Sequence, residues 1–261
     1  MLSTPAPVRV WEHSFAIYRR IWRSNVLGAF VQPLLYLLGM GLGVGALVDR
    51  GSSSLELLDG LSYFAFIAPA LLATTAMMVS SQEAMWPVIE AFMWSNSYRS
   101  MAATPLSPGE IVSGVALWQL TRAAIAVTGV AIVLAFFDET RSLGLLLAIP
   151  FGALTGLAFS VPLTAWSSTR HHETSFPSIQ RFVIVPLFLF GGAFYPVDQL
   201  PDWMHPIAKA TPLWHGVQLC RDAVLDRLAV ADTIAHVGVL CAFVAAGLVV
   251  CRITYSRRLA E

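Results

Sequence analysis

The sequence has few charged residues. Only 12% of its 261 residues are Asp, Glu, Lys or Arg, whereas hydrophobic residues make up 56%. A soluble domain usually carries about 25% charged residues, so this chain cannot cover a water-facing surface, and an ordinary soluble enzyme is excluded. The apolar content is also too high for a disordered protein. The formal net charge is zero, so a nucleic-acid partner is not expected.

Cysteine is scarce as well. The three cysteines, Cys220, Cys241 and Cys251, form no C-x-x-C pair, so a zinc or redox motif is unsupported. His171-His172-Glu173 is the only cluster with metal-ligand side chains, but adjacent histidines cannot share a helix face, and no distant third ligand is evident. We expect neither a metal site nor a catalytic residue in this chain.

A nucleotide-binding loop is also missing. No G-x-x-x-x-G-K-[ST] segment occurs. The glycine-rich GMGLGVG at 39–45 has no lysine and lies inside an apolar run, where glycines usually allow helices to pack closely. We therefore expect no cofactor in this chain.

Long apolar runs dominate what is present. About 20 apolar residues cross a bilayer as a helix. The sequence predicts an all-α integral membrane protein with six transmembrane helices. The fifth is short and is interrupted by Pro186 and by Gly191-Gly192. The predicted spans are 26–48, 61–81, 111–137, 143–166, 179–194 and 233–253.

An amphipathic helix is predicted at 5–24, before the first span. Trp11, Phe15, Tyr18 and Trp22 follow helical spacing on one face, with arginines on the opposite side. This pattern is typical of a helix that lies flat in the lipid headgroup layer. A surface helix packed on a soluble domain is the alternative.

The distribution of positive charge orients the spans. With an N-terminus inside, the inner segments carry ten arginines and the outer segments carry five Lys or Arg. Inner loops carry the excess of positive charge, so both termini are expected in the cytoplasm. The expected location is the cytoplasmic membrane of a bacterium, with membrane lipids as neighbours.

Two segments are predicted not to span. The segment 82–110 is too polar and too interrupted to cross the membrane and too long for a simple turn. Trp86-Pro87 and the Pro105/Pro108 pair bracket a predicted short cytoplasmic helix. The segment 195–232 is divided by four prolines, which predicts short amphipathic helices at the outer side, in a broken re-entrant hairpin between the fifth and sixth spans.

Two stretches carry a family resemblance: MAATPLSPGEIVSG at 101–114 and FGGAFYPVDQLPDWMHPIAKATPLWHGVQLCR at 190–221. With the order of the spans, they resemble the permease subunits of ABC type-2 exporters. The likeness is strongest to the nodulation-type lipooligosaccharide and daunorubicin-resistance-type branch. It implies that residues 1–261 form a single transmembrane domain. It also implies a second permease copy, identical or related, and ABC ATPase subunits that bind ATP and Mg.

The resemblance also implies roles for residues. The segment 82–110 would couple to the ATPase, although its charges could simply solvate a loop. The coupling candidates are Glu83, Glu90, Arg99 and Pro105. The second and fifth spans would line the substrate path, and core packing is the alternative for each residue. The path candidates are Phe66, Thr74, Met77, Met78, Phe188, Phe190 and Phe194, and the outer-gate candidates are Trp203 and Trp214.

One charge lies inside a predicted span. Arg122 shares a helix face with Gln119 in the third span. A charge within the membrane is a functional hypothesis, but an arginine near the helix start could also extend its side chain to the cytoplasm. The sequence is compatible with both interpretations of Arg122.

The predicted function is that of a transport subunit, not an enzyme. The chain would move a lipid-like, glycolipid or hydrophobic drug-like substrate outward with energy from a partner ATPase. A rhomboid-like intramembrane protease is one alternative, because Ser113 and His236 exist, but no G-x-S motif surrounds the serine. An ion-driven secondary transporter is another, but internal repeats and buried acidic residues are not evident.

Overall fold

The computed structural model describes residues 5–48, 58 and 60–260 of the chain. In this part of the chain every regular element is helical and no strand occurs. The predicted all-α class is therefore confirmed.

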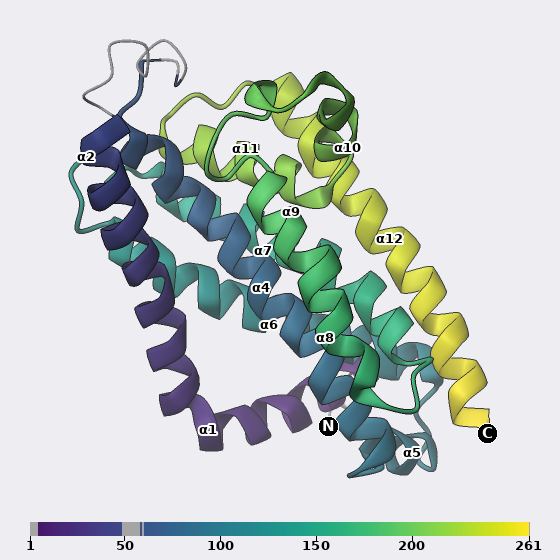
Figure 1. Cartoon of the computed structure of the whole chain (residues 1–261). Helices are drawn as coiled ribbons and strands as arrows, with labels where there is room; N and C mark the ends of the chain where they lie inside the picture. Colours follow the sequence, from purple (N-terminus) through teal and green to yellow (C-terminus); the bar gives the residue numbers. More distant parts are fainter. Residues whose placement is uncertain (1–4, 49–57, 59, 261) are drawn as a thin grey trace.

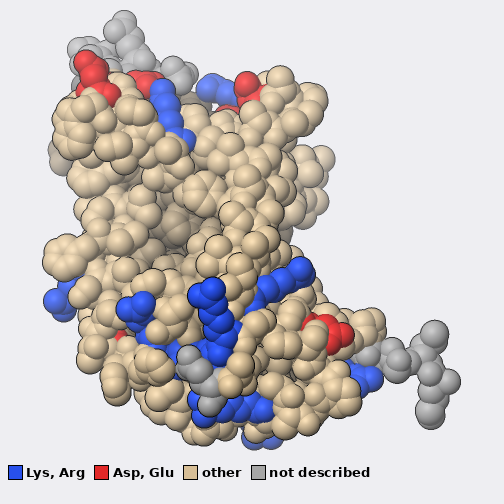
Figure 2. Space-filling model, turned by 90° about the vertical axis from the view of Figure 1, so that its right-hand side faces the viewer, with Lys and Arg blue, Asp and Glu red and all other residues tan. Residues whose placement is uncertain are grey.

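Four helices are long and apolar enough to cross a membrane. They correspond to the second, third, fourth and sixth predicted spans. These helices are α4 (Tyr63–Met93), α6 (Pro108–Leu134), α7 (Gly144–Ser167) and α12 (Val230–Ala260). Figure 2 shows an uncharged band between two charged ends of the molecule. A band of this kind suits the hydrocarbon layer of a bilayer, so the chain is a multi-pass membrane protein.

The two ends of the bundle differ in the elements they carry. Both ends of the chain and α5 (Ser97–Ala102) lie at one end, called here the α5 end (Figure 1). The opposite end, called the α11 end, carries α10 (His205–Lys209) and α11 (Pro212–Val224).

Helix α7 lies at the centre and contacts α4, α6, α11 and α12. Close packing there depends on Gly156. A Cβ atom at this position would lie 2.5 Å from Oγ of Ser80 in α4 and 2.8 Å from Cβ of Ala123 in α6. Small residues of this kind let membrane helices approach each other.

The predicted amphipathic helix and the beginning of the first span form one helix, α1 (Ala6–Tyr36). The rest of that span consists of η1 (Leu37–Val44) and α2 (Gly45–Val48). Figure 1 shows that α1 bends sharply, so that its N-terminal arm lies across the α5 end of the bundle. The aromatic face of this arm packs on α6. The Trp11 Nε1–H donates to Thr121 Oγ1 at 2.9 Å, and the buried Tyr18 ring meets Trp118 edge to face at 5.5 Å. Protein therefore covers part of the predicted aromatic stripe, whereas Phe15 and Trp22 are exposed.

The fifth predicted span begins and ends slightly earlier in the chain than expected. It consists of α8 (Phe176–Ile179), η3 (Gln180–Ile184) and α9 (Val185–Phe190), preceded by η2 (Glu173–Ser175). The helix ends at Gly191, and Gly192 has a φ of +80° that favours glycine. The predicted extension to residue 194 is therefore wrong, because the glycine pair ends the helix.

The segment after this turn forms short helices, as predicted. They are η4 (Val197–Gln199), η5 (Asp202–Met204), α10 and α11. The apolar face of α11 is buried in the bundle. Its members are Leu213, Val217, Cys220 and Val224.

The segment 82–110 differs most from the prediction. Helix α4 continues through Pro87 to Met93, so residues 82–93 are helical and not part of a loop. A proline removes one backbone hydrogen bond from a helix, but Met85, Ile89 and Phe92 are buried on the same stretch and hold it in place. The predicted short helix is α5, which follows this extension.

Candidate functional site

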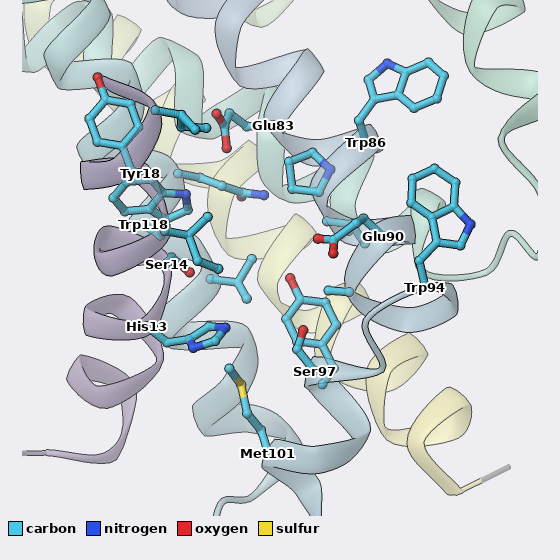
Figure 3. A pocket seen from close by; sticks show the side chains of 18 residues that line it. His13, Ser14, Tyr18, Glu83, Trp86, Glu90, Trp94, Ser97, Met101 and Trp118 are labelled. Carbon is cyan, nitrogen blue, oxygen red and sulfur yellow. The ribbon is translucent and has the colours of Figure 1, made fainter. Parts of the chain in front are cut away.

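A cavity opens at the α5 end between α1, α4, α5 and α6 (Figure 3). Its volume is about 360 Å³, and aromatic side chains form much of its wall. Two predicted coupling residues, Glu83 and Glu90, line it. Other residues that line the cavity include His13, Tyr18, Trp86, Trp94, Tyr98, Trp118 and Gln119.

Glu83 forms an ion pair inside the bundle. The Arg122 Nε–H of α6 donates to Glu83 Oε1 at 2.7 Å, and the two side chains are only 11% and 15% exposed. The Arg122 guanidinium also lies over the Tyr18 ring, 4.5 Å from its centroid. Arg122 therefore neither extends to the solvent nor lies unpaired. It joins α6 to α4 and to α1.

Glu90 lies about two turns further along α4. Figure 3 shows its carboxylate directed from α4 toward α1, with Tyr18, Trp118 and His13 across the cavity. Among the described residues no cation lies within ion-pair distance of this carboxylate. Glu90 thus differs from Glu83 in having no charged partner there.

Gln119 is the most deeply buried polar residue of the cavity wall. Its side chain amide donates from Nε2 to Thr164 Oγ1 at 2.7 Å, so it joins α6 to α7. Its Oε1 is buried and accepts no hydrogen bond from any residue that the structure describes. The predicted shared face of Gln119 and Arg122 therefore reaches two different neighbouring helices.

Helix α5 is held on one side and exposed on the other. The Tyr98 ring is buried against Phe92 of α4 at 4.9 Å and Tyr255 of α12 at 5.4 Å. Burial is the largest cause that raises the pKa of Tyr98 above its ordinary value. The predicted coupling residues Arg99 and Pro105 are both exposed. This arrangement leaves one face of α5 free for a partner and connects the other to two long helices.

Arg258 of α12 also contacts Phe92, near the Tyr98 ring. Its guanidinium lies 4.4 Å from the centroid of Phe92, and its Nη1 donates to the main-chain carbonyls of Ser168 and Arg170. The end of α12 is therefore joined to the turn after α7 and to the end of α4.

The start of α6 is fixed by a capping box. Ser107 Oγ accepts from the Glu110 amide, and the Ser107 amide donates to Glu110 Oε2 at 2.8 Å. These hydrogen bonds, first from the Ser107 backbone and then from its hydroxyl, lower the pKa of the Glu110 carboxyl. A box of this kind satisfies free amides at a helix start and sets where the turn after α5 ends.

Arg221 is a buried cation at the α11 end that the sequence interpretation missed. Its Nε–H donates to the Phe66 carbonyl at 3.1 Å, and its Nη2 donates to the Gly192 carbonyl at 2.9 Å. The guanidinium lies over the Phe66 ring at 3.8 Å. It thus joins α11 to the start of α4 and to the turn after α9. Arg221 directly follows Cys220 on the apolar face of α11, and this position could have indicated from the sequence that the arginine is buried.

The predicted outer-gate residues are not brought together. Trp203 is 67% exposed, whereas Trp214 packs edge to face on His215 and His236. The two histidines lie with their Nδ1 atoms 2.7 Å apart and join α11 to α12.

Most predicted path residues are packed inside the chain. Phe188 and Phe194 meet edge to face at 4.9 Å, and both contact Tyr36 of α1. Of the seven path candidates, Phe190 is exposed and Met78 is half-buried. The buried ones are Phe66, Thr74, Met77, Phe188 and Phe194.

The residues of the alternative functions do not assemble. Ser113 donates to the Gly109 carbonyl of its own helix at 2.8 Å, near the α5 end, whereas His236 contacts α11 at the opposite end. A serine-histidine pair is thus not formed. Within the described ranges no group of three or more metal-ligand side chains occurs.

Comparisons with known proteins agree with this architecture. A family model described as ABC-2 type transporter matches residues 8–225. Nodulation protein J of Rhizobium leguminosarum bv. viciae is 34% identical over 250 residues, which cover 96% of this chain and 93% of that protein. Nodulation protein J of Rhizobium meliloti is 31% identical over 236 residues, covering 90% of this chain and 87% of that protein.

A more distant relative is the inner membrane transport permease YadH of Escherichia coli. It is 23% identical over 250 residues, which cover 93% of this chain and 91% of that protein. The resemblance found in the sequence is therefore confirmed, and the chain belongs to the ABC-2 type transporter family as a nodulation-type permease.

Proposed function

We propose that this chain is the permease of an ATP-driven exporter, in which two permease copies form the pathway and ATPase subunits dock at the α5 end. Membership of the ABC-2 family implies ATPase partners in a transporter complex. The export direction, the pairing of permeases and the docking site are our proposals.

The charge distribution supports a cytoplasmic α5 end. Lys and Arg side chains predominate over acidic ones at this end in Figure 2, whereas neither sign predominates so clearly at the α11 end. Cytoplasmic ends of membrane proteins carry the excess of Lys and Arg. A soluble ATPase would therefore meet α5 rather than α11.

The contacts of α5 carry the coupling proposal. A force on the exposed Arg99 of α5, or on Pro105 in the turn after α5, reaches α4 and α12 through the buried Tyr98. Glu83 and Glu90 face the cavity instead of the exposed side of α5. We assign docking to Arg99 and Pro105, and we assign to Glu83 the positioning of α6 and α1 relative to α4.

Helix α4 connects the two ends of the molecule. It runs from the Phe92 contact with α5 to the Phe66 contact with Arg221, which is about 40 Å of helix at 1.5 Å per residue. Because Arg221 also binds the turn after α9, a tilt of α4 would move the α11 end. This connection is the route by which ATP-driven closure would open the outer side.

The proposed substrate is lipid-like, glycolipid or a hydrophobic drug. The exposed residues Phe182, Leu189 and Phe190 form an apolar surface on η3 and α9. Together with a second permease copy, this surface would line a path for an amphiphile. Aromatic side chains contact such molecules without fixed polar recognition.

The test is reconstitution of the permease with its ATPase in proteoliposomes. We expect ATP-dependent outward movement of a fluorescent lipid, lost when Arg99→Glu reverses a charge on α5. The matched control, Arg141→Glu, reverses an exposed charge at the opposite end and should preserve transport. Equal loss in both variants, or transport driven by an ion gradient without ATP, would contradict the proposal.

A further inference from the structure

The cavity at the α5 end carries one carboxylate without a counter-charge. Glu83 and Glu90 both line it, but Arg122 neutralises Glu83 at 2.7 Å. No ion pair of Glu90 occurs in the part of the chain that the structure describes. A partly enclosed carboxylate without a cation is costly, so the cavity is complementary to a positive charge.

The walls are aromatic. Tyr18 and Trp118 line the cavity from α1 and α6, across from the Glu90 carboxylate, whereas the rings of Trp86 and Trp94 point away from that carboxylate (Figure 3). Aromatic faces attract ammonium groups, most strongly where water is excluded. The Glu90 carboxylate and the aromatic wall therefore both favour a cationic ligand.

A second acceptor lies deeper in the cavity. Gln119 is 2% exposed, lines the cavity, and has an Oε1 without a hydrogen-bond partner among the described residues. Buried polar atoms are rarely left without a partner. The cavity wall thus contains two acceptor residues, Glu90 and Gln119, and an ammonium group carries the N–H donors that such acceptors require.

The mouth of the cavity is apolar. Ile17 and Ile21 of α1 line it and are largely exposed, as is Trp86 of α4. A volume of about 360 Å³ lies within the range of small-molecule sites. It accommodates a small cation with an apolar tail.

We propose that this cavity binds a primary ammonium group attached to an apolar tail, with Glu90 as the counter-charge and Gln119 as a second acceptor. The group could belong to a free amphiphilic amine or to an ethanolamine lipid headgroup, and the experiment separates these sources. The site is distinct from the proposed substrate path on η3 and α9. It does not depend on ATP, so its failure would leave the export proposal untouched.

The experiment measures binding of tritiated phenethylammonium to the full-length permease in phosphatidylcholine nanodiscs without ATPase. The competitors are phenethyl alcohol and phenylacetate, which keep the ring but are neutral and anionic. We expect neither competitor to displace the labelled cation. Glu90→Gln should weaken its binding about tenfold, which corresponds to about 1.4 kcal/mol, and Gln119→Leu should weaken it by a smaller factor.

The control variant is Glu12→Gln, which removes an exposed carboxylate from α1 outside the cavity and should leave binding unchanged. Phosphatidylethanolamine in the nanodiscs should displace the amine if a lipid headgroup is the occupant, and it should have no effect if a free amine is. Both results support the site.

Three results would overturn the proposal. The first is equal binding of the three phenyl compounds, and the second is unchanged affinity in Glu90→Gln despite normal thermal stability. The third is absence of amine binding to the wild-type permease.

Discussion

Arg122 of α6 and Glu83 of α4 form an ion pair with 2.7 Å between Nε and Oε1, and both side chains are largely buried. The pair lies beside the cavity and under the Tyr18 ring of α1. Removal of one partner from a buried pair leaves the other charge without compensation, which typically costs about 3–5 kcal/mol. We therefore expect Arg122→Leu to destabilise the protein strongly, as measured by thermal unfolding in detergent.

The double variant Arg122→Leu with Glu83→Leu should recover most of that stability, because neither charge is then left buried alone. A single variant as stable as the wild type would show that the pair does not hold α4 and α6 together.

Gly114 should be intolerant of any side chain. A Cβ atom there would lie 2.5 Å from both the Pro7 carbonyl oxygen and Val10 Cβ. We expect Gly114→Ala to displace the N-terminal arm of α1 from α6 and to lower stability by about 1–3 kcal/mol. Limited proteolysis within the arm and thermal unfolding measure this effect.

Gly109 in the same helix provides the matched control. A Cβ atom there meets only Arg252 Nε, at 3.9 Å. Gly109→Ala should therefore stabilise α6 slightly, since alanine favours a helix by up to about 1 kcal/mol over glycine. The two substitutions should have opposite signs, and equal effects would contradict the packing described for α1.

Arg221 should be irreplaceable by lysine. Its planar fork binds the carbonyls of Phe66 and Gly192 at the same time, and a lysine cannot reproduce two separated donors in a fixed plane. We expect Arg221→Lys to lose about 1–3 kcal/mol and to reduce transport by the reconstituted complex.

The matched variant Arg227→Lys changes an exposed arginine after the same helix and should behave like the wild type. If Arg221→Lys also retained full stability and transport, the proposed route from α4 to the α11 end would be wrong.

Acidification should weaken the α11–α12 contact at His215. Burial is the first cause that lowers the pKa of His215, the His236 ring lowers it further, and a hydrogen bond with the Lys209 backbone opposes both. The folded state therefore prefers neutral His215, and the unfolded state binds more protons as the pH falls below roughly 6.5. The stabilisation is complete above that pH and is lost below it.

Thermal unfolding at roughly pH 7.5 and 5.5, on either side of the ordinary histidine pKa, measures this loss. His215→Gln should reduce the pH dependence, whereas His171→Gln, an exposed residue near the other end, should not. An unchanged pH profile in His215→Gln would rule out His215 as the responsible group.

Long apolar runs were sufficient to predict the main helices. Helices α4, α6, α7 and α12 follow the second, third, fourth and sixth predicted spans, because length and hydropathy alone define a crossing helix. The helix through Pro87 was missed, since the buried residues around it, not local preference, keep α4 continuous to Met93. The end of α9 was displaced because the glycine pair stops the helix.

The site contacts could be predicted only in part. Arg122 stood out as a charge within an apolar run, but its partner Glu83 is 39 residues away, and no spacing rule connects them. Arg221 and Phe66 are 155 residues apart. Such contacts depend on how α4, α6 and α11 pack, which a single sequence does not encode in a local pattern.

The most direct test of the account is a cysteine cross-link from α5 to the ATPase. In a Cys241→Ser background, which removes the one exposed native cysteine among the described residues, Arg99→Cys and Arg141→Cys would each be treated with a short bismaleimide in the assembled complex. ATPase docking at α5 predicts an adduct from position 99 and none from position 141. An adduct from position 141 alone would place the ATPase at the α11 end and contradict both the orientation and the coupling through α5.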